Sequence, residues 1–371
     1  MARLGDIATY VNGFAFKPSD WSNEGLPIIR IQDLTGNSYQ ANRYNGSYHP
    51  KYEVNDGDVL ISWSASLGVY VWKGEKAVLN QHIFKVVFDK SEVDKNFFVH
   101  QVQNILENAA SEAHGATMKH LTKPVFDALP FYLPSIEKQK EIASVLDKVT
   151  ELIALRKEQL AKLDELVKSR FIELFGDGQN PKVALIDLVE EGAGLSYGIV
   201  QPGDDGTGDM GVLRPVDMVD GKISTASIKY IDRSIGDGFR KTELTGDELL
   251  ITVRGTTGIT ALTDNRFIGM NVTRGIAVVR YDRNKINPVY LNAYLNTDES
   301  QRYIKEHTRG ATLQQINLSD LRVQEIVVPP KEQQEQMAAF VEQTDKSKFD
   351  LKQSLEKLET LKKSLMQQYF G

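Results

Sequence analysis

The 371-residue sequence has no cysteine and no long hydrophobic run, and its acidic residues outnumber its basic ones. Without cysteine the chain cannot form disulfides, cysteine-ligated zinc sites, iron–sulfur clusters or thiol nucleophiles, and a reducing compartment is favoured. Nowhere do about 18 apolar residues run together, and the N-terminus has no apolar signal segment, so we expect no membrane span and a cytoplasmic protein. The 44 basic and 50 acidic residues give a net charge of −6, which argues against a surface that is positive throughout.

The motifs of several enzyme classes are also missing. There is no GxxxxGK[ST] phosphate loop, and the glycines of 192–198 lack the dinucleotide-binding spacing, so we interpret this segment as a turn. The six histidines show neither HxxxH nor HExxH spacing, so no metal site is expected. Asn287-Pro288-Val289-Tyr290 approximates the Asn-Pro-Pro-aromatic motif of amino-methyltransferases, but asparagine before proline is also an ordinary helix start. We therefore expect no catalytic residues, with a catalytic methyltransferase as a weaker alternative.

The chain contains an internal repeat. Residues 115–176 and 310–371 align without a gap at an offset of 195, and about a quarter of the aligned positions are identical, far above the level of chance. Upstream the likeness is looser, and Asn80 before one hydrophobic segment corresponds to Asn271 before another. The sequence therefore predicts two similar units arranged as a pseudo-two-fold repeat.

Each repeat ends in a long amphipathic segment, 136–175 and 331–370, which follows prolines and places apolar residues mostly at steps of three, four or seven. The pattern predicts two helices of about 40 residues, each about 60 Å long, whose apolar stripes need a partner. We expect the helices to pair as an antiparallel coiled coil; alternatively, each packs only on its own globular domain. The residues predicted to form the helix seam are Val145, Val149, Leu152, Leu163, Phe171, Phe340, Leu351, Leu355, Leu358 and Leu365.

The remaining segments have the pattern of an α+β fold. Short β-rich runs, at 25–32, 58–63, 69–72 and 83–88, are separated by Gly, Asn and Asp turns. Helices are expected at 96–110 and 288–305. The expected fold class is α+β, with two mainly antiparallel domains separated by the two long helices. The expected boundaries are 1–135 for domain 1, 136–182 for the first helix and linker, 183–330 for domain 2, and 331–371 for the second helix.

Two variable α+β domains alternating with two similar long helices make the chain resemble the specificity (S) subunit of type I restriction–modification systems. In the second unit the resemblance is carried by Gly310-Ala311-Thr312-Leu313, 316–321, 326–328, Pro329-Pro330 and 332–334. In the first unit it is carried by Gly115-Ala116-Thr117, Leu129-Pro130, Leu133-Pro134, Glu137 and Gln139. The likeness covers essentially the whole chain, and the first unit departs from the pattern at Lys123-Pro124, where the second has Leu318-Ser319.

The resemblance implies a non-catalytic subunit that binds double-stranded DNA with a bipartite target. Each variable domain would be a target-recognition domain for one half-site, while the helices set the spacing and bind two modification (methyltransferase) subunits. Restriction subunits with ATP-driven translocation can join the complex, so S-adenosylmethionine and ATP are expected on the partner subunits and no cofactor in this chain. The alternative is a duplicated coiled-coil scaffold that binds proteins but not DNA.

The candidate DNA-contacting residues lie in the polar loops of the two variable domains. Small Gly, Ser and Thr loops let backbone amides approach phosphates, whereas Arg, Gln and Asn can make bidentate contacts with bases. The alternative is that these loops are only strand turns. The candidates of domain 1 are Ser62, Trp63, Ser64, Ser66, Gly68, Asn80, Gln81, His82, Lys119 and His120. The candidates of domain 2 are Arg254, Thr256, Thr257, Gly258, Asn271, Thr273, Arg274, Arg309, Thr312, Gln314 and Gln315.

The two variable domains differ in their basic residues. Eleven of the sixteen basic residues of 183–330 are arginine, against three of twelve in 1–135, and the net charges are −4 and −2. We therefore expect the two domains to recognise different half-sites. Because neither domain is basic overall, the modification subunits should supply much of the positive charge that contacts the DNA phosphates. The isolated chain should therefore bind DNA poorly.

Overall fold

The computed structural model describes residues 1–37, 42–112, 122–203, 206, 208–219 and 221–371. By its internal contacts the chain divides into two compact units: unit 1 comprises 1–157 and 353–371, and unit 2 comprises 158–352. Two helices, α5 (Ile136–Phe175) and α9 (Lys331–Phe370), each contribute residues to both units. Their bounds are those predicted from the apolar periodicity.

Unit 1 is built from short strands and helices that precede α5 in the chain. Its strands are β1 (Ala2–Arg3), β2 (Thr9–Asn12), β3 (Leu26–Ile29), β4 (Arg43–Tyr44), β5 (Glu53–Val54), β6 (Val59–Ser62), β7 (Gly68–Val71), β8 (Ala77–Leu79), β9 (Ile83–Val87) and β10 (Pro130–Phe131). Its helices are α1 (Leu4–Ile7), α2 (Ile31–Leu34), α3 (Lys95–Glu112) and α4 (Lys123–Ala128), with 3₁₀ turns η1 (Pro18–Asp20) and η2 (Pro50–Tyr52).

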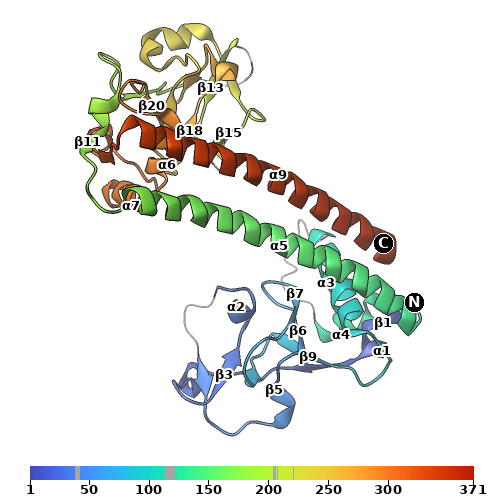
Figure 1. Ribbon diagram of the computed structural model, residues 1–371. Helices are drawn as coiled ribbons and strands as arrows, with labels where there is room; N and C mark the ends of the chain where they lie inside the picture. Colours follow the sequence, from blue (N-terminus) through green and yellow to red (C-terminus); the bar gives the residue numbers. More distant parts are fainter. Residues whose placement is uncertain (38–41, 113–121, 204–205, 207, 220) are drawn as a thin grey trace. The chain divides into compact units, whose positions relative to one another are not determined.

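The strands of unit 1 form two four-stranded sheets. The first, in the order β2–β9–β6–β7, is antiparallel throughout, and α3 packs against β7 (Figure 1). The second, in the order β4–β3–β8–β5, contains the parallel pair β3–β8. Side chains of β6 alternate between two cores: Val59 and Ile61 face the cluster that includes the helices, whereas Leu60 faces the second sheet. The central strand is thus buried on both faces, which fixes its register.

Unit 2 repeats this arrangement. Its strands are β11 (Lys182–Ala184), β12 (Ser196–Tyr197), β13 (Met210–Leu213), β14 (Met218–Val219), β15 (Lys222–Ile223), β16 (Lys229–Ile231), β17 (Leu249–Thr252), β18 (Thr260–Leu262), β19 (Asn271–Val272), β20 (Ile276–Val279) and β21 (Glu325–Val327). Its helices are α6 (Pro288–Leu295), α7 (Asp298–His307) and α8 (Leu318–Arg322), with 3₁₀ segments η3 (Leu185–Leu188), η4 (Pro215–Asp217), η5 (Arg233–Thr242) and η6 (Asn265–Phe267).

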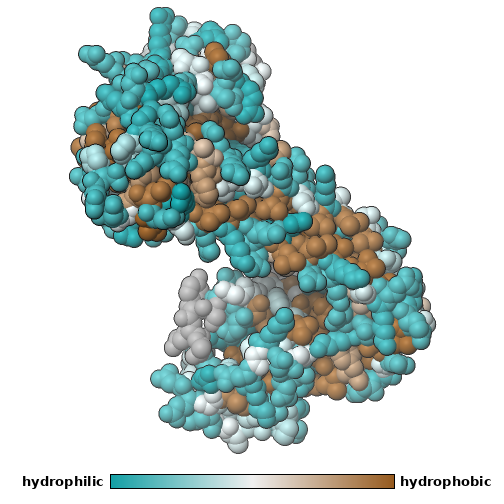
Figure 2. All heavy atoms as spheres, in the orientation of Figure 1, coloured by the Kyte–Doolittle hydropathy of each residue, from teal (hydrophilic) through white to brown (hydrophobic). Residues whose placement is uncertain are grey.

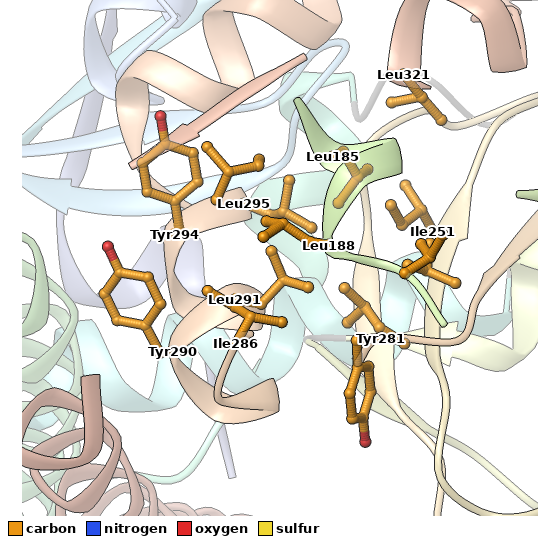
Figure 3. Close-up of a cluster of buried hydrophobic side chains, with 14 of the residues drawn as sticks. Leu185, Leu188, Ile251, Tyr281, Ile286, Tyr290, Leu291, Tyr294, Leu295 and Leu321 are labelled. Carbon is orange, nitrogen blue, oxygen red and sulfur yellow. The ribbon is translucent and has the colours of Figure 1, made fainter. Parts of the chain in front are cut away.

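The topology of unit 2 matches that of unit 1 strand for strand around its centre. The sheet β12–β20–β17–β18 is antiparallel, and the sheet β16–β13–β19 contains the parallel pair β13–β19. On β17, Leu249 and Ile251 face the helical core and Leu250 faces the second sheet. Figure 3 shows the helical core, in which the side chains of α6 pack toward Ile251. The matched topology confirms the predicted repeat and the mainly antiparallel α+β class.

The long helices pair in antiparallel fashion within each unit. In unit 1, Ile142 near the start of α5 shares a core with Met366, and Arg156 Nε donates to Ser354 Oγ at 3.3 Å. In unit 2, Asp164 lies 2.6 Å from Lys348, and Phe171 shares a core with Met337. Residues later in α5 therefore contact residues earlier in α9, as expected for an antiparallel pair.

The seam follows a heptad pattern, with alternating steps of four and three. The predicted seam residue Leu152 is not part of it, because its side chain is 43% exposed and the stripe passes from Val149 to Ile153. Val145 and Phe340 also lie one position off the stripe and are half-buried, and Phe171, likewise off the stripe, is buried against Tyr290. The buried or half-buried heptad positions are Ile142, Leu146, Val149, Ile153, Arg156, Leu160, Leu163 and Val167 in α5 and Met337, Val341, Thr344, Lys348, Leu351, Leu355, Leu358, Lys362 and Leu365 in α9.

One predicted helix is in fact two. The segment 288–305 breaks into α6 and α7 because Thr297 has extended backbone geometry and its hydroxyl accepts the amide of Ser300, which caps a new helix. The predicted helix 96–110 is α3, whose first turn is capped by Asp94 Oδ1 accepting from Phe97. Among the described residues, no helix has the length and apolar character needed to cross a membrane.

Candidate nucleic-acid interface

The candidate loops of unit 1 lie at one edge of the first sheet. Because β6 and β9 are antiparallel, with Ser62 opposite Ile83, the loop after β6 meets the loop before β9. The backbone N–H of Trp63 donates to the carbonyl of His82 at 3.3 Å, and the two rings are 5.0 Å apart. Residues 63–67 and 80–82 thus form one surface, as strand pairing requires.

Not all of these candidates face solvent. Ser62 is fully buried, and its hydroxyl donates to the carbonyl of Ser66 at 2.6 Å. Ser64 and Gly68 are buried as well. These three residues therefore shape the loop, whereas Ser66 and Gln81 are exposed and Trp63, Asn80 and His82 are half-buried. Lys119 and His120 lie outside the described residues.

The sequence prediction missed the end of β2, which joins the same surface. Asn12 is exposed, and its Oδ1 accepts from Trp63 Nε1 at 3.3 Å. The next residue must be glycine, because a Cβ on Gly13 would lie 2.0 Å from the carbonyl oxygen of Asn80. The signal available in the sequence was the glycine that follows a β-rich run in each unit.

Unit 2 shows the same close approach at the corresponding place. A Cβ on Gly198 would lie 1.9 Å from the carbonyl oxygen of Val272, and Ile199 forms a parallel bridge with Thr273 just as Phe14 does with Asn80. This register aligns the positions of the two units, and it places Asn80 opposite Thr273 rather than opposite the Asn271 expected from the sequence. Tyr197 stands where unit 1 has Asn12, Arg254 where it has Ser64, and Arg274 where it has Gln81.

At this edge unit 2 has a surface hollow of about 230 Å³. Its lining residues are Tyr197, Val200, Val253, Arg254, Arg274 and Gln315. Three of them were predicted from the sequence as DNA contacts, and the structure brings them together although they are up to about 60 positions apart.

The loop that carries Gln315 is fixed by backbone hydrogen bonds. Arg309 and Gln315 exchange two bonds of 2.8 Å, which closes the loop between them. The N–H of Gly255 donates to the carbonyl of Gln314 at 2.8 Å, and that of Ile316 donates to Val253 at 3.0 Å. Gln315 is therefore held beside Arg254.

The other candidates of unit 2 divide between shaping and exposed roles. Asn271 is buried: its Nδ2 donates to the carbonyl of Phe239 at 3.1 Å, and its Oδ1 accepts from Thr242 at 2.8 Å. Gly258 is also buried, with φ +88°. Thr257 and Thr308 share a hydroxyl–hydroxyl bond of 3.0 Å. Thr273 is half-buried, and the exposed candidates are Thr256, Arg274, Arg309, Thr312 and Gln314.

The segment that approximates a methyltransferase motif has a structural role. Asn287 Oδ1 accepts from the backbone amides of Val289 and Tyr290 and so caps α6. Tyr290 is fully buried, stacks on Phe171 and donates its hydroxyl to the carbonyl of Val327 at 2.8 Å. Burial raises the pKa of the Tyr290 hydroxyl well above its usual value. A side chain so enclosed cannot hold a flipped base.

Comparison with known proteins places this arrangement in context. The sequence model for the type I restriction modification DNA specificity domain matches residues 1–165 and 216–363. The EcoBI specificity subunit of Escherichia coli is 24% identical over 402 aligned residues, which cover 99% of this chain and 84% of that protein. The putative type I specificity subunit S.MpnORF89P of Mycoplasma pneumoniae is 29% identical over 195 residues, or 50% of this chain and 54% of that protein.

Solved structures share the fold, among them two that cover nearly the whole of this chain. One is a chain from work on complex assembly and conformational transition of the type I R-M system, with a TM-score of 0.58 and 16% identity, covering 100% of this chain and 96% of that chain. The other is the type I S subunit from M. genitalium, with a TM-score of 0.55 and 13% identity, covering 98% and 94%. The two ranges matched by the family model fit two target-recognition domains.

Proposed function

The chain belongs to the type I restriction modification DNA specificity family, and from this premise we propose that it is a non-catalytic subunit whose two α+β domains each bind one half-site of a bipartite DNA target. The domains are those of 1–135 and 183–330. The proposal depends on the surface at the ends of β2 and β12. The two units have the same backbone arrangement of loops there, although the side chains on those loops differ. A shared frame with variable side chains suits the recognition of two different sequences.

The long helices are the proposed binding surface for two modification subunits. Several of their leucines face solvent: Leu155, Leu166 and Leu361 are 45%, 48% and 46% exposed. Figure 2 shows apolar side chains gathered along α5. Large apolar side chains exposed on the surface of a helix favour a protein partner. In this proposal S-adenosylmethionine and ATP are held by the modification and restriction subunits, and the complex acts in the cytoplasm.

Binding of DNA duplexes to the purified complex tests the proposal. The chain is purified with its native modification subunit, and the affinity for fluorescent duplexes is measured by anisotropy at several salt concentrations. Sequence-specific, salt-dependent binding is expected, because phosphate contacts release counterions. If the complex binds no DNA at any salt concentration, the chain is a protein-binding scaffold. If the chain alone transfers methyl groups, the non-catalytic assignment is wrong.

A further inference from the structure

The hollow of unit 2 contains two arginines and no carboxylate among its lining residues. Arg254 follows β17 and Arg274 follows β19, and their backbones are neighbours because the N–H of Val253 donates to the carbonyl of Gly275 at 2.8 Å. The N–H of Arg274 donates to the carbonyl of Ile199, also at 2.8 Å. Both side chains therefore start from well-anchored strand ends.

These two guanidinium groups differ from most other arginines of unit 2. Most of those lie within 4 Å of a carboxylate: Arg170 with Glu173, Arg214 with Asp217, Arg233 with Asp209, Arg240 with Asp237, Arg266 with Asp264, Arg280 with Glu248, Arg283 with Asp247 and Arg309 with Asp320. Within the described part of the chain, neither Arg254 nor Arg274 has an ion pair or a side-chain hydrogen bond. Since arginine stays charged and carries several N–H donors, both groups are available to a ligand that supplies acceptors.

The walls of the hollow are suited to an aromatic, acceptor-bearing ligand. The Tyr197 hydroxyl accepts from the backbone N–H of Leu318 at 3.2 Å, which fixes the ring at the edge of the hollow. Val200 and Val253 add apolar surface, and Gln315 adds an amide. Guanine presents two adjacent acceptors, N7 and O6, in the major groove, and the planar fork of arginine matches them bidentately.

We propose, on the basis of the DNA-binding function above, that this hollow reads guanine, with Arg254 and Arg274 as the specificity-determining residues of the second half-site. The matched positions of unit 1 are Asn12, Ser64 and Gln81, none of which is charged. Guanine reading by an arginine pair is therefore confined to unit 2. The two oxygens of a phosphate group offer the same acceptor chemistry. The test must therefore distinguish arginine contacts with the guanine base from arginine contacts with the DNA phosphates.

The test uses the full complex with its native modification subunit and the duplex target established by mapping methylated sites in cells. Each guanine is replaced in turn by 7-deazaguanine, which removes the N7 acceptor and leaves pairing and phosphates unchanged. Affinities are compared for the native complex, Arg254→Gln and Arg274→Gln. The control is Arg266→Gln, an exposed arginine beyond the opposite end of the β17–β18 hairpin.

For the native complex, 7-deazaguanine at one or two positions of a single half-site should weaken binding about tenfold. The Arg254→Gln or Arg274→Gln complex should bind the natural target about tenfold more weakly and be insensitive to 7-deazaguanine at that same position, whereas Arg266→Gln should behave as native. Equal 7-deazaguanine penalties in native and variant, with a shallower salt dependence in the variant, would mean phosphate contact and overturn the proposal. The proposal would also be overturned if the mapped half-site that unit 2 reads contained no guanine on either strand. Absence of DNA binding by the native complex would instead refute the proposed function itself.

Discussion

Gln139 and Gln334, which are 195 positions apart, make the same pair of hydrogen bonds at the starts of the two long helices. Gln139 Oε1 accepts from the N–H of Asp94 at 2.8 Å and its Nε2 donates to the carbonyl of Pro134 at 2.8 Å. Gln334 does the same with Asn287 at 2.8 Å and Pro329 at 2.9 Å. Each glutamine ties the long helix to the start of a helix of its own domain. Both are nearly fully buried, so the two contacts are shielded from water.

Replacement of either glutamine should destabilise the protein. Gln334→Ala leaves the partly buried N–H of Asn287 and the buried carbonyl of Pro329 without partners, which costs about 1–3 kcal/mol of unfolding free energy. Chemical denaturation of the full chain measures the change. Gln333→Ala, at the exposed neighbouring position, is the matched control and should lie within about 0.5 kcal/mol of native. Equal stabilities of the two variants would contradict this role for Gln334.

Charged residues in the helix seam should disrupt the pairing of α5 and α9. Leu163→Asp and Leu358→Asp place a carboxylate at half-buried positions of the heptad stripe, where an unpaired charge that is shielded from water is penalised. We expect a loss of about 3 kcal/mol or more, or failure to fold. Leu152→Asp is the control, because that leucine is exposed and should tolerate the change. Circular dichroism with thermal unfolding compares the three variants, and similar melting temperatures would show that the seam is misassigned.

The stability of the protein should fall below neutral pH because of His100. Burial lowers the pKa of this imidazole below its usual 6.5, and the nearby Asp147, with Oδ1 2.7 Å from Nε2, only partly offsets that effect. Above about pH 6.5 neither the folded nor the unfolded state is protonated there, so no stability is lost. As pH falls below that value, the unfolded chain takes up the proton first, and unfolding becomes easier.

Unfolding curves of the native protein and His100→Gln at pH 7.5 and 5.5 measure this effect. The native protein should lose more stability than the variant over that interval. His49→Gln, an exposed histidine of the same unit, controls for the removal of an imidazole in general. A stability loss that is the same with and without His100 would show that another group is responsible.

The length of the long helices should set the gap between the half-sites if they act as the spacer. Insertion of one heptad into each helix, after Lys157 and after Lys352, preserves the seam and adds about 10 Å. With B-DNA rising about 3.4 Å per base pair, the nonspecific gap should grow by about three base pairs while both half-sites stay the same. Mapping of methylated sites in cells gives the gap directly. An active variant with an unchanged gap would show that the length of the helices does not set the spacing between the half-sites.

Exchange of residues 183–330 for the corresponding domain of another specificity subunit should change one half-site only. The reason is that the proposed recognition surface of unit 2 is built from β12, β17 and β19 and from the loop between Arg309 and Gln315, all inside the exchanged segment. Methylation mapping before and after the exchange reports both half-sites. A simultaneous change in both would contradict independent reading.

The sequence by itself determined the long helices and the repeat. Both depend on local patterns: prolines before each helix, a heptad period of apolar residues, and a terminal glycine at 176 or 371. The ungapped offset of 195 then required the second helix to resemble the first. Even here only the structure shows which residues form the apolar stripe. After Val149, Leu152 at a step of three fits the sequence pattern as well as Ile153 at a step of four.

Only the tertiary structure decided which loop residues form the proposed recognition surface. Ser62 and Asn271 are as polar as Gln81, yet the chain buries both in hydrogen bonds to its own loops. Asn12 and Tyr197 join the surface because strand pairing brings them beside segments more than 50 positions away. Local sequence fixes which residues are polar, but the burial of each one depends on distant strands that pack around it, and this non-local packing is absent from any single stretch of sequence.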